Sequence, residues 1–582
     1  MKNIALILIL IFGLSSKNHA QQNDKSDLYY KIPQEKVFLH YNSTFLLSGE
    51  KLLYKIYCIN SKTKELSNLS KIAYVELIDH NQKVRFKHKI KLTAGLGQGD
   101  FFIPTTLLSG NYKVIAYTKW MRNGGKNNFF HGDITILNPF SINSGLLTIK
   151  NDSLYNQQNG NLKSTHTSYK NDANKSHLLA LSLNKDQFGN REKVILNMSS
   201  LNGDVAHGNY SISVKKTDDF PQVSKPTAIT YESLFDRGAS KQKGITSSTI
   251  PEFRGELISG VVINKASNIV ASDISVSLSI PGENYIFKIS KTNNNGNFHF
   301  NVNEQYSSSN GVIEIINKNT ENLKIIINKI VPLDYGGLKF KDFELSKKIK
   351  KLIVKRSINN QIENAYNSLK QDSLISYSNT GKFYSSKNYE YFLDDYKRFP
   401  TLQETLTEII HSVYYVKKDD QYYLKVLGFD FLSKENKPII LMDGMLILDH
   451  NEIINLNTET VKKITVLKEN YIYGTENFNG IIDIETFEGD YQNIKNSDYV
   501  KNIDLLKALT PKKYFNVMYD KNLDRIPDLR RQLFWKPNFE LSENVSSIVF
   551  YTSDDNGIYE INLEGFTNYG KPVSIKIFFS VQ

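Results

Sequence analysis

The segment from Pro438 to Glu488, PIILMDGMLILDHNEIINLNTETVKKITVLKENYIYGTENFNGIIDIETFE, carries the most specific pattern in the chain. Its first apolar run ends at Asp443-Gly444, a dipeptide that readily adopts the positive φ angles of a tight turn. A second run, with imperfect alternation, begins at Val461, and a third begins at Gly480. Because short apolar runs bounded by turn residues are typical of strands, the segment predicts a compact mixed unit with at least three strands.

This order of features resembles the plug domain of TonB-dependent outer-membrane receptors. That domain runs from a proline through an apolar strand, Asp-Gly, a helical stretch, a strand ending near Leu-Lys, Tyr-Gly and Asn-Gly to a final strand. The residues that carry the resemblance are Pro438, Asp443, Gly444, Ile464, Val466, Leu467, Lys468, Tyr473, Gly474, Asn479, Gly480 and Ile484. We call the following residues the plug-like motif: Pro438, Asp443, Gly444, Lys468, Tyr473, Gly474, Asn479 and Gly480. Glu469 to Ile472 replace the small residues that the family carries there, so the resemblance implies no function for that loop.

The plug-like module is expected to span residues 389–490. The segment YFLDDYKRFPTLQETLTEII, which begins at Tyr391, resembles the lead-in to the plug in related exported proteins, and apolar residues at helical spacing predict a helix from Leu402 to Val416. The residues after Glu488 are too few for a membrane barrel, which needs at least roughly eight strands of about ten residues. The resemblance therefore implies a plug without its own barrel; the alternative is a small α/β module with no transport role.

The amino-terminal residues predict export. Lys2 precedes an apolar run from Ile4 to Leu14, and small and polar residues then lead to Ala20. This pattern is typical of a secretory signal peptide, residues 1–20, whose apolar core is too short to span a membrane. An uncleaved anchor is the alternative. We expect the mature protein in the periplasm or associated with the outer membrane.

Composition favours several β-rich domains. The chain has 582 residues with 12% aromatic side chains, and Cys58 is its single cysteine, which excludes an intramolecular disulfide. The formal net charge is +12, but the lysines are scattered, which indicates a solvated surface rather than a nucleic-acid site. The densest basic run, Lys347 to Arg356, alternates with apolar residues and predicts a strand with one solvated face; contact with an anionic surface is the alternative.

Short apolar runs between turn residues predict a first β-sandwich at residues 34–140. It resembles the MG2-type macroglobulin sandwich through Gln34, Glu35, Lys36, Leu39, Gly49, Glu50, Gly110, Tyr112 and Tyr117. The run Gly95 to Gly99 suggests a phosphate-binding loop, but such a loop should open a helix. These glycines instead lead into a predicted strand, Phe101 to Pro104, so no cofactor is expected.

Residues 177–217 resemble part of a second macroglobulin-like sandwich that strands elsewhere complete, and residues 529–582 resemble a macroglobulin-like closing segment. The predicted linkers are residues 141–176 and 218–250, and the predicted connectors are residues 331–388 and 491–528. Ile358 to Lys370 in the first connector has helical spacing. The turn at Asp554 to Gly557 predicts a hairpin. The aspartates suggest calcium binding as an alternative, but one turn supplies too few oxygen atoms for that ion.

Residues 251–330 alternate apolar and polar side chains and predict a further sandwich with a hairpin at Asn295-Gly296. The pattern resembles the carboxypeptidase regulatory-like domain, which is immunoglobulin-like, through Gly255, Gly260, Val262, Gly296, Phe298 and Phe300. The name implies no peptidase here, because no histidine opens a His-x-x-Glu or His-Glu-x-x-His zinc motif.

The predicted fold is therefore mainly β, with tandem macroglobulin-like and immunoglobulin-like sandwiches and a small α/β plug-like domain. We expect no catalytic residue, cofactor or metal, because the sequence has no nucleophile elbow, paired metal ligands or phosphate loop. The resemblances imply a non-catalytic exported scaffold or transport accessory protein. Its partner would be an outer-membrane β-barrel protein or a surface complex, with peripheral membrane contact through that partner and no nucleic acid. The alternatives are a protease-binding protein, without a thioester because Cys58 lacks that motif, or a surface glycan or adhesion binder.

Overall fold

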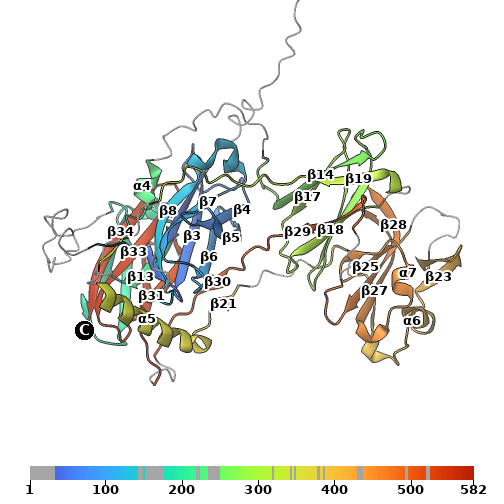
Figure 1. Ribbon diagram of the computed structural model, residues 1–582. Helices are drawn as coiled ribbons and strands as arrows, with labels where there is room; N and C mark the ends of the chain where they lie inside the picture. Colours follow the sequence, from blue (N-terminus) through green and yellow to red (C-terminus); the bar gives the residue numbers. More distant parts are fainter. Residues whose placement is uncertain are drawn as a thin grey trace, which may run out of the picture.

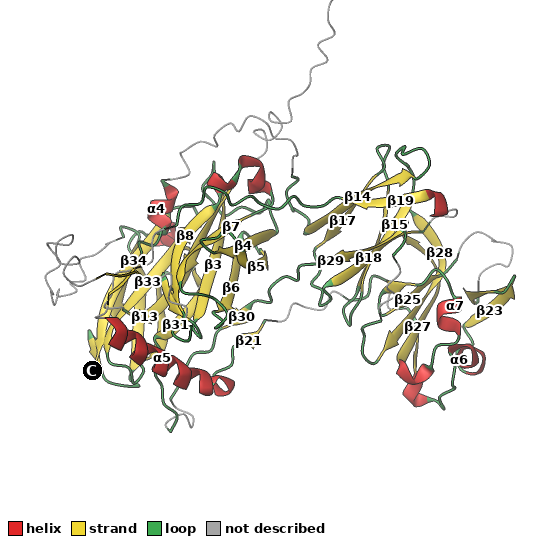
Figure 2. Cartoon of the chain, in the orientation of Figure 1, coloured by secondary structure: helices red, strands yellow, loops and turns green. Residues whose placement is uncertain are grey.

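The computed structural model describes residues 33–141, 148–150, 176–217, 223–233, 249–316, 320–340, 344–346, 349–375, 381–384, 387–428, 437–491, 496–519 and 525–582. These residues form two lobes joined by extended segments; one lobe holds the first and last strands and also α5 (Lys350–Ala365), and the other holds the strands from β14 (Glu256–Asn264) to β19 (Leu323–Ile327) and from β22 (Tyr389–Phe392) to β29 (Val500–Asp504) (Figure 1). Strands far outnumber helices (Figure 2), so the protein is mainly β, as the sequence predicts. The predicted signal peptide and most of the linkers 141–176 and 218–250 lie outside the described residues.

Two sheets form the first β-sandwich. The five-stranded sheet has the order β2 (Phe45–Leu47), β8 (Phe130–Leu137), β7 (Gly110–Tyr117), β4 (Ile72–Ile78) and β5 (Val84–Lys91). The three-stranded sheet has the order β1 (Glu35–Tyr41), β3 (Lys51–Asn60) and β6 (Leu96–Phe102). The core between the sheets is apolar, because alternate side chains of each strand point to the same face. The 3-10 helices η1 (Trp120–Gly124) and η2 (Lys126–Asn128) precede β8.

The glycines of the run Gly95 to Gly99 lie largely within β6, so the predicted strand begins earlier than Phe101. A Cβ atom on Gly99 would lie 2.3 Å from the hydroxyl oxygen of Tyr54 on the neighbouring strand β3. Glycine at this position therefore lets a bulky side chain cross the sheet surface.

The segments 177–217 and 529–582 form one second sandwich and are not separate domains. One sheet has the order β10 (Leu179–Leu183), β12 (Lys193–Ser200) and β32 (Val545–Tyr551). The other has the order β11 (Gln187–Phe188), β34 (Pro572–Val581), β33 (Gly557–Thr567), β13 (Gly208–Lys216) and β31 (Gln532–Leu541). The hairpin prediction at Asp554 to Gly557 is wrong, because this turn carries the chain from one sheet to the other. The 3-10 helix η3 (Gly203–Ala206) makes a similar crossing between β12 and β13.

The two sandwiches pack against each other through the second face of the β1-β3-β6 sheet. The ring of Phe38 on β1 lies 5.7 Å from that of Phe566 on β33 and 5.6 Å from that of Tyr231 on α4 (Ala228–Glu232). Apolar and aromatic burial at this contact joins the two sandwiches into the first lobe.

A helix, α5 (Lys350–Ala365), lies along the outside of this lobe (Figure 1), where the sequence predicts a strand over Lys347 to Arg356 and a later helix. The strand prediction is wrong because Arg356 is not a solvated charge. Its Nε and Nη2 atoms each donate to Glu50 at 2.7 Å, and only 7% of its side chain is exposed. Ile353, one turn earlier, packs on Phe45 and Leu137, so the buried positions follow the helical period.

The second lobe contains a two-sheet sandwich at the predicted residues 251–330, which we call the immunoglobulin-like sandwich after that prediction. One sheet has the order β17 (Asn297–Val302), β14 (Glu256–Asn264) and β19 (Leu323–Ile327), and the other has the order β16 (Ile286–Lys291), β15 (Ser275–Ile280), β18 (Asn310–Ile315) and β29 (Val500–Asp504). The strand β29 comes from the predicted connector 491–528, so that connector contributes one strand to the sandwich. The Asn295-Gly296 turn crosses from β16 to β17 in the other sheet, so the hairpin prediction there is wrong. A 3-10 helix, η4 (Thr320–Asn322), precedes β19.

The plug-like module has a five-stranded sheet with the order β22 (Tyr389–Phe392), β27 (Val461–Tyr473), β28 (Glu476–Thr486), β25 (Ile439–Met442) and β26 (Met445–Leu446). On one face lie α6 (Leu402–Glu408), α7 (Asn451–Ile454) and a hairpin of β23 (Val413–Lys418) and β24 (Gln421–Val426). The predicted helix from Leu402 to Val416 is too long, because its second half is β23, whose β-branched and aromatic residues pair with β24. The 3-10 helices are η7 (Leu393–Asp395) and η8 (Thr458–Thr460).

Short elements complete the connections. They are β9 (Thr148–Lys150), which pairs with β20 (Glu344–Ser346), β21 (Ser373–Leu374), which pairs with β30 (Lys512–Lys513), and η6 (Asn367–Leu369). None of the helices in the described part of the chain combines the length and the apolarity needed to cross a membrane.

Candidate functional site

The Asp443-Gly444 turn of the plug-like motif joins β25 to β26, and both residues have positive φ angles, 48° and 85°. The Asp443 side chain is buried and fixes this turn to the end of β28. Its Oδ1 accepts a hydrogen bond from the Thr486 amide at 2.8 Å, and its Oδ2 accepts from the Thr486 hydroxyl at 2.6 Å and the Tyr491 amide at 3.0 Å. These bonds satisfy the buried carboxylate, which identifies Asp443 as a structural anchor.

Gly444 packs on the immunoglobulin-like sandwich. A Cβ atom on Gly444 would lie 2.2 Å from the Cβ of Tyr285, which precedes β16. Beside it, the Gly282 amide donates to the Asp443 carbonyl at 3.2 Å, and the Leu446 amide donates to the Ser279 hydroxyl at 3.2 Å. The turn is therefore a contact between the two modules.

The Tyr473-Gly474 pair of the motif also lies at this contact. The Tyr473 hydroxyl donates to the Phe287 carbonyl at 2.6 Å, and the two rings stack with centroids 5.8 Å apart. A Cβ on Gly474 would lie 3.2 Å from the carbonyl oxygen of Ile289 on β16. Four residues of the plug-like motif thus lie against the immunoglobulin-like sandwich of the same chain: Asp443, Gly444, Tyr473 and Gly474.

The remaining motif residues shape the sheet itself. Pro438 precedes β25, and the Asn479 amide donates to the Lys437 carbonyl at 3.2 Å. Gly480 has φ 87°, and a Cβ there would lie 2.5 Å from the Leu467 carbonyl oxygen. Lys468 reaches the other edge of the sheet, where its Nζ lies 4.3 Å from the ring centroid of Tyr389 on β22.

A buried polar cluster that the sequence did not reveal lies at the same contact. Asp483 on β28 has no exposed surface, and its Oδ2 accepts hydrogen bonds from the Tyr285 hydroxyl at 2.7 Å and the Tyr384 hydroxyl at 2.6 Å. The Lys382 ammonium lies 2.7 Å from the same oxygen and 2.8 Å from Glu485. Burial and the Asp483 charge both raise the pKa of Tyr285 well above its ordinary value, so this hydroxyl stays protonated and donates.

A large cleft lies where the first lobe, the immunoglobulin-like sandwich and the plug-like module meet. Its volume is about 1280 Å³, and we call it the junction cleft. Lysines dominate its lining, against the acidic residues Glu283 and Glu304: they are Lys87, Lys89, Lys91, Lys288, Lys382, Lys507 and Lys512. Sequence reasoning missed this site, because its residues come from distant segments of the chain and form no local motif.

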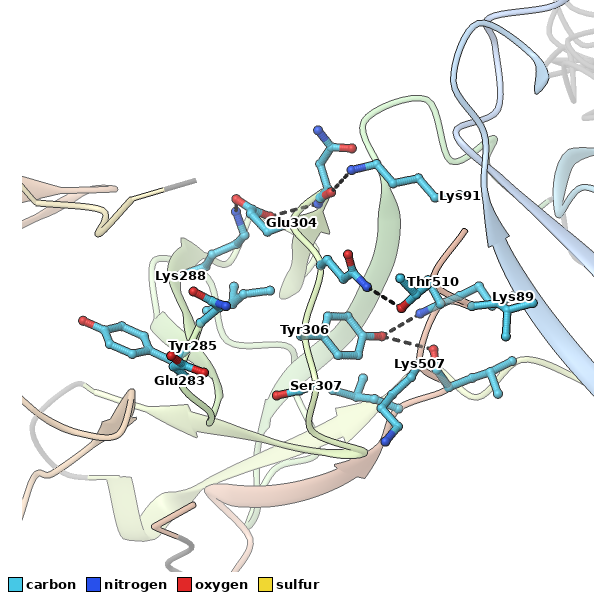
Figure 3. A pocket seen from close by; sticks show the side chains of 18 of the residues that line it. Lys89, Lys91, Glu283, Tyr285, Lys288, Glu304, Tyr306, Ser307, Lys507 and Thr510 are labelled. Atoms are coloured by element: carbon cyan, nitrogen blue, oxygen red, sulfur yellow. Dashed lines mark hydrogen bonds and ion pairs between the residues drawn. The ribbon is translucent and has the colours of Figure 1, made fainter. Parts of the chain in front are cut away.

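The walls of the junction cleft are tied together by hydrogen bonds, which Figure 3 shows around Tyr306. The Lys89 ammonium of β5 donates to the Tyr306 hydroxyl at 2.6 Å and pairs with Glu256 at 2.8 Å. Burial lowers the pKa of Lys89, and the Glu256 carboxylate opposes that shift. The Gln305 amide donates to the Thr510 hydroxyl at 3.0 Å, which fixes the extended segment after β29 across the cleft.

A serine and a histidine also meet in space, between the two sandwiches of the first lobe. The Nδ1 atom of His40 and the Oγ of Ser211 lie 2.6 Å apart, and the Tyr57 hydroxyl donates to the same Oγ at 3.0 Å. Both His40 and Ser211 have no exposed surface, so no substrate reaches this pair in the folded chain. Burial, followed by nearby lysines, lowers the pKa of His40 well below its ordinary value, which keeps the buried ring neutral.

The residues that the structure describes hold no group of three or more His, Cys, Asp or Glu side chains able to bind a metal ion. The two aspartates of the turn at Asp554 to Gly557 form ion pairs with basic side chains of this chain. Asp554 lies 2.6 Å from Arg191, and Asp555 lies 2.7 Å from Lys216.

Comparisons with known proteins give only distant structural likeness. No protein-family model matches the sequence, and no curated protein matches it. Salmonella alpha-2-macroglobulin reacted with methylamine is 10% identical with a TM-score of 0.23, covering 94% of this chain and 39% of that one. The native Escherichia coli alpha-2-macroglobulin is 10% identical with a TM-score of 0.23, and the match covers 94% of this chain and 40% of that one. The Escherichia coli adhesin FdeC is 10% identical with a TM-score of 0.14, and the match covers 32% of this chain and 50% of that one.

This chain thus spans about two fifths of the length of the macroglobulins that it resembles. The class that its own strands define is a mainly β protein of packed sandwiches.

Proposed function

We propose that the protein is a non-catalytic exported scaffold at the outer membrane that binds a membrane-protein partner. The partner would be an outer-membrane β-barrel protein, such as a TonB-dependent transporter, or a surface assembly. The resemblances to MG2-type, carboxypeptidase regulatory-like and plug domains support this role, and so does the predicted signal peptide. Contact with the membrane would be peripheral, through the partner.

One observation carries the proposal: both faces of the plug-like sheet are covered within this chain. The helices α6 and α7 and the β23-β24 hairpin cover one face. Phe287 and its neighbours in the immunoglobulin-like sandwich cover the other, and the β26 edge lies beside Ser279. Among the described residues, β22 pairs only with β27, so this edge is open to a partner.

The β22 edge has the side chains of a protein contact. Tyr389 is 52% exposed and Phe392 is 43% exposed, and lysines lie against both rings. Aromatic residues are enriched where binding energy concentrates in interfaces. Because β22 has only four residues, side-chain contacts rather than a long backbone ladder would dominate the binding.

The test is an affinity pull-down of tagged mature protein from gently solubilised envelopes. We compare the native chain with the double variant Tyr389→Ser/Phe392→Ser. The matched control is Phe102→Ser/Tyr569→Ser, which removes two exposed aromatic rings from the first lobe. Point variants are preferable to deletion of residues 389–490, because that deletion would uncover Phe287, which is 3% exposed.

We expect the native chain and the control to recover a β-barrel protein and the β22 variant to lose it. We also expect high salt or urea to release the protein from outer membranes. Equal recovery by all three chains would move the contact away from β22. If the native chain recovers nothing, the scaffold proposal fails, and the alternatives of protease or glycan binding become the ones to test. A thioester trap remains excluded, because Cys58 lacks the motif and is fully buried.

A further inference from the structure

We propose that the outer face of α5 binds directly to an anionic lipid bilayer. The helix lies along the outside of the first lobe (Figure 1), apart from the β22 edge, so this contact goes beyond the partner contact proposed above. The two proposals share only the predicted export of the chain. Three features of the helix support a lipid contact: an apolar row, positive charge and a convex surface.

The inner face of α5 is fixed to the first lobe, which leaves the opposite face to solvent. Ile353 and Arg356 are buried, and the Asn360 side-chain amide donates to the Ser48 carbonyl at 3.1 Å. Because residues three and four positions apart lie on the same face of a helix, a second set of side chains points the other way. We call this set the α5 outer face: Lys351, Val354, Lys355, Ile358 and Ile362.

One row of the α5 outer face is apolar. Val354, Ile358 and Ile362 follow one another at four-residue intervals; Val354 is 48% exposed and Ile358 is 51% exposed. Valine and isoleucine have lower helix propensity than lysine or glutamine, so helix formation alone does not favour them at these exposed positions. An apolar row on a solvent-facing helix is typical of contact with another protein or with a membrane.

The lysines of the α5 outer face keep their charge, unlike most lysines of the junction cleft. Lys351 and its neighbour Lys350 are exposed, and neither forms an ion pair among the described residues. The Lys355 side chain is 68% exposed, and its ammonium lies 3.8 Å from Asp555, whose carboxylate already lies 2.7 Å from Lys216. The amino-terminal half of α5 therefore presents positive charge that the described carboxylates do not neutralise.

The helix itself adds no negative charge to this face. Its sequence, KKLIVKRSINNQIENA, contains one acidic residue, Glu363, whose carboxylate lies 2.7 Å from the Lys370 ammonium. Anionic lipid headgroups attract basic side chains that lie close to them, and salt screens this attraction. A face that combines exposed lysines with an apolar row therefore complements an anionic bilayer in both charge and hydrophobicity.

The shape of the contact favours a bilayer over a protein groove. Because the inner half of α5 is bonded to the first lobe, a groove cannot enclose the helix as it does in helix-in-groove recognition. The backbone groups within a helix are already hydrogen-bonded, so this face cannot accept an added strand. A fluid bilayer accepts single apolar side chains between its headgroups, while the flexible lysine stems carry their ammonium groups to the phosphates.

The experiment measures flotation of the full mature chain with lipid vesicles that contain no protein. One set of vesicles holds phosphatidylglycerol and phosphatidylethanolamine in equal parts, and the other holds phosphatidylcholine alone. The charge variant is Lys351→Gln/Lys355→Gln. Its matched control is Lys417→Gln/Lys418→Gln, which removes two exposed lysines from β23 in the second lobe.

The apolar variant is Val354→Gln/Ile358→Gln. Its matched control is Ile330→Gln/Val331→Gln, at positions outside α5 that are 56% and 66% exposed. Glutamine has a higher helix propensity than valine or isoleucine, so the apolar variant keeps the helix. Urea unfolding checks that each variant is as stable as the native chain.

We expect the native chain to bind the anionic vesicles and not the phosphatidylcholine vesicles. The charge variant should weaken binding about thirtyfold and the apolar variant about tenfold, while both controls bind as the native chain does. No binding by the native chain, equal binding to both kinds of vesicle, or a variant that binds as tightly as its control would overturn the proposal. Loss in the charge variant alone would show that the face takes an acidic protein or polymer instead. Because the vesicles hold no protein, these outcomes are independent of the pull-down that tests β22.

Discussion

Substitution of Gly444 by alanine tests whether the plug-like motif holds two modules of this chain together. Two costs add at this position. A non-glycine residue in the left-handed region costs roughly 1–2 kcal/mol, and Gly444 has φ 85°. Overpacking typically costs about 1–3 kcal/mol, and the new Cβ would lie 2.2 Å from Tyr285. The expected loss of local stability is therefore about 2–5 kcal/mol.

Gly489 provides a matched control in the same module. It also has a positive φ, 64°, but a Cβ there would lie 3.6 Å from the nearest atom, the Glu283 amide nitrogen, which is ordinary contact. Gly489→Ala should therefore carry only the backbone cost of roughly 1–2 kcal/mol.

The assay is native-state hydrogen exchange read by mass spectrometry. Peptides from β25, β28 and β16 report the contact, because exchange measures local opening free energies. Both tryptophans, Trp120 and Trp535, lie in the first lobe, so their fluorescence during urea unfolding serves as an internal control. Gly444→Ala should speed exchange on both sides of the contact and leave the first lobe unchanged. If it costs no more than Gly489→Ala, or affects only β25, the docking argument is wrong.

Two further predictions concern burial of charge. Arg356→Ala should destabilise the first lobe by about 3–5 kcal/mol, because it leaves the Glu50 carboxylate without its bidentate partner. Tryptophan fluorescence during urea unfolding measures this loss of stability. A loss below about 1 kcal/mol would contradict the prediction. Burial lowers the pKa of His88 and of His450 to about 4 each, so between pH 6.5 and pH 4 the folded chain binds fewer protons than the unfolded chain. Stability should therefore fall by about 3 kcal/mol per histidine as the pH drops through that window, and His450→Gln should flatten the fall in the second lobe.

Local chemistry in the sequence identified the features that depend on neighbouring residues alone. Asp443-Gly444 predicts a tight turn, and both residues adopt positive φ angles. The β-rich composition and the short alternating runs predict a mainly β fold, which the sheets confirm. Each of these outcomes is decided within a few residues, where backbone sterics and side-chain alternation act directly.

The errors arise where distant residues decide the outcome. Lys347 to Arg356 has the alternation of a half-solvated strand, but the chain from Lys350 onward forms the helix α5. On that helix Arg356 has a buried partner, Glu50, which is far away in the sequence. The turns at Asn295-Gly296 and near Asp554 have hairpin chemistry. In a sandwich, the same turn can pass a strand to the opposite sheet, and its residues do not specify which sheet receives the chain.

The candidate sites show the same division. The plug-like motif was found because its glycines and its Asp443 shape backbone locally, but the surface against which they pack includes Tyr285 and Phe287 from another module. The junction cleft had no local signal at all, since its lysines come from distant parts of the chain and form no motif. A motif that resembles a membrane plug can thus serve as an internal joint. Both faces of its own sheet are then occupied, and among the described residues its β22 edge has no further strand paired to it.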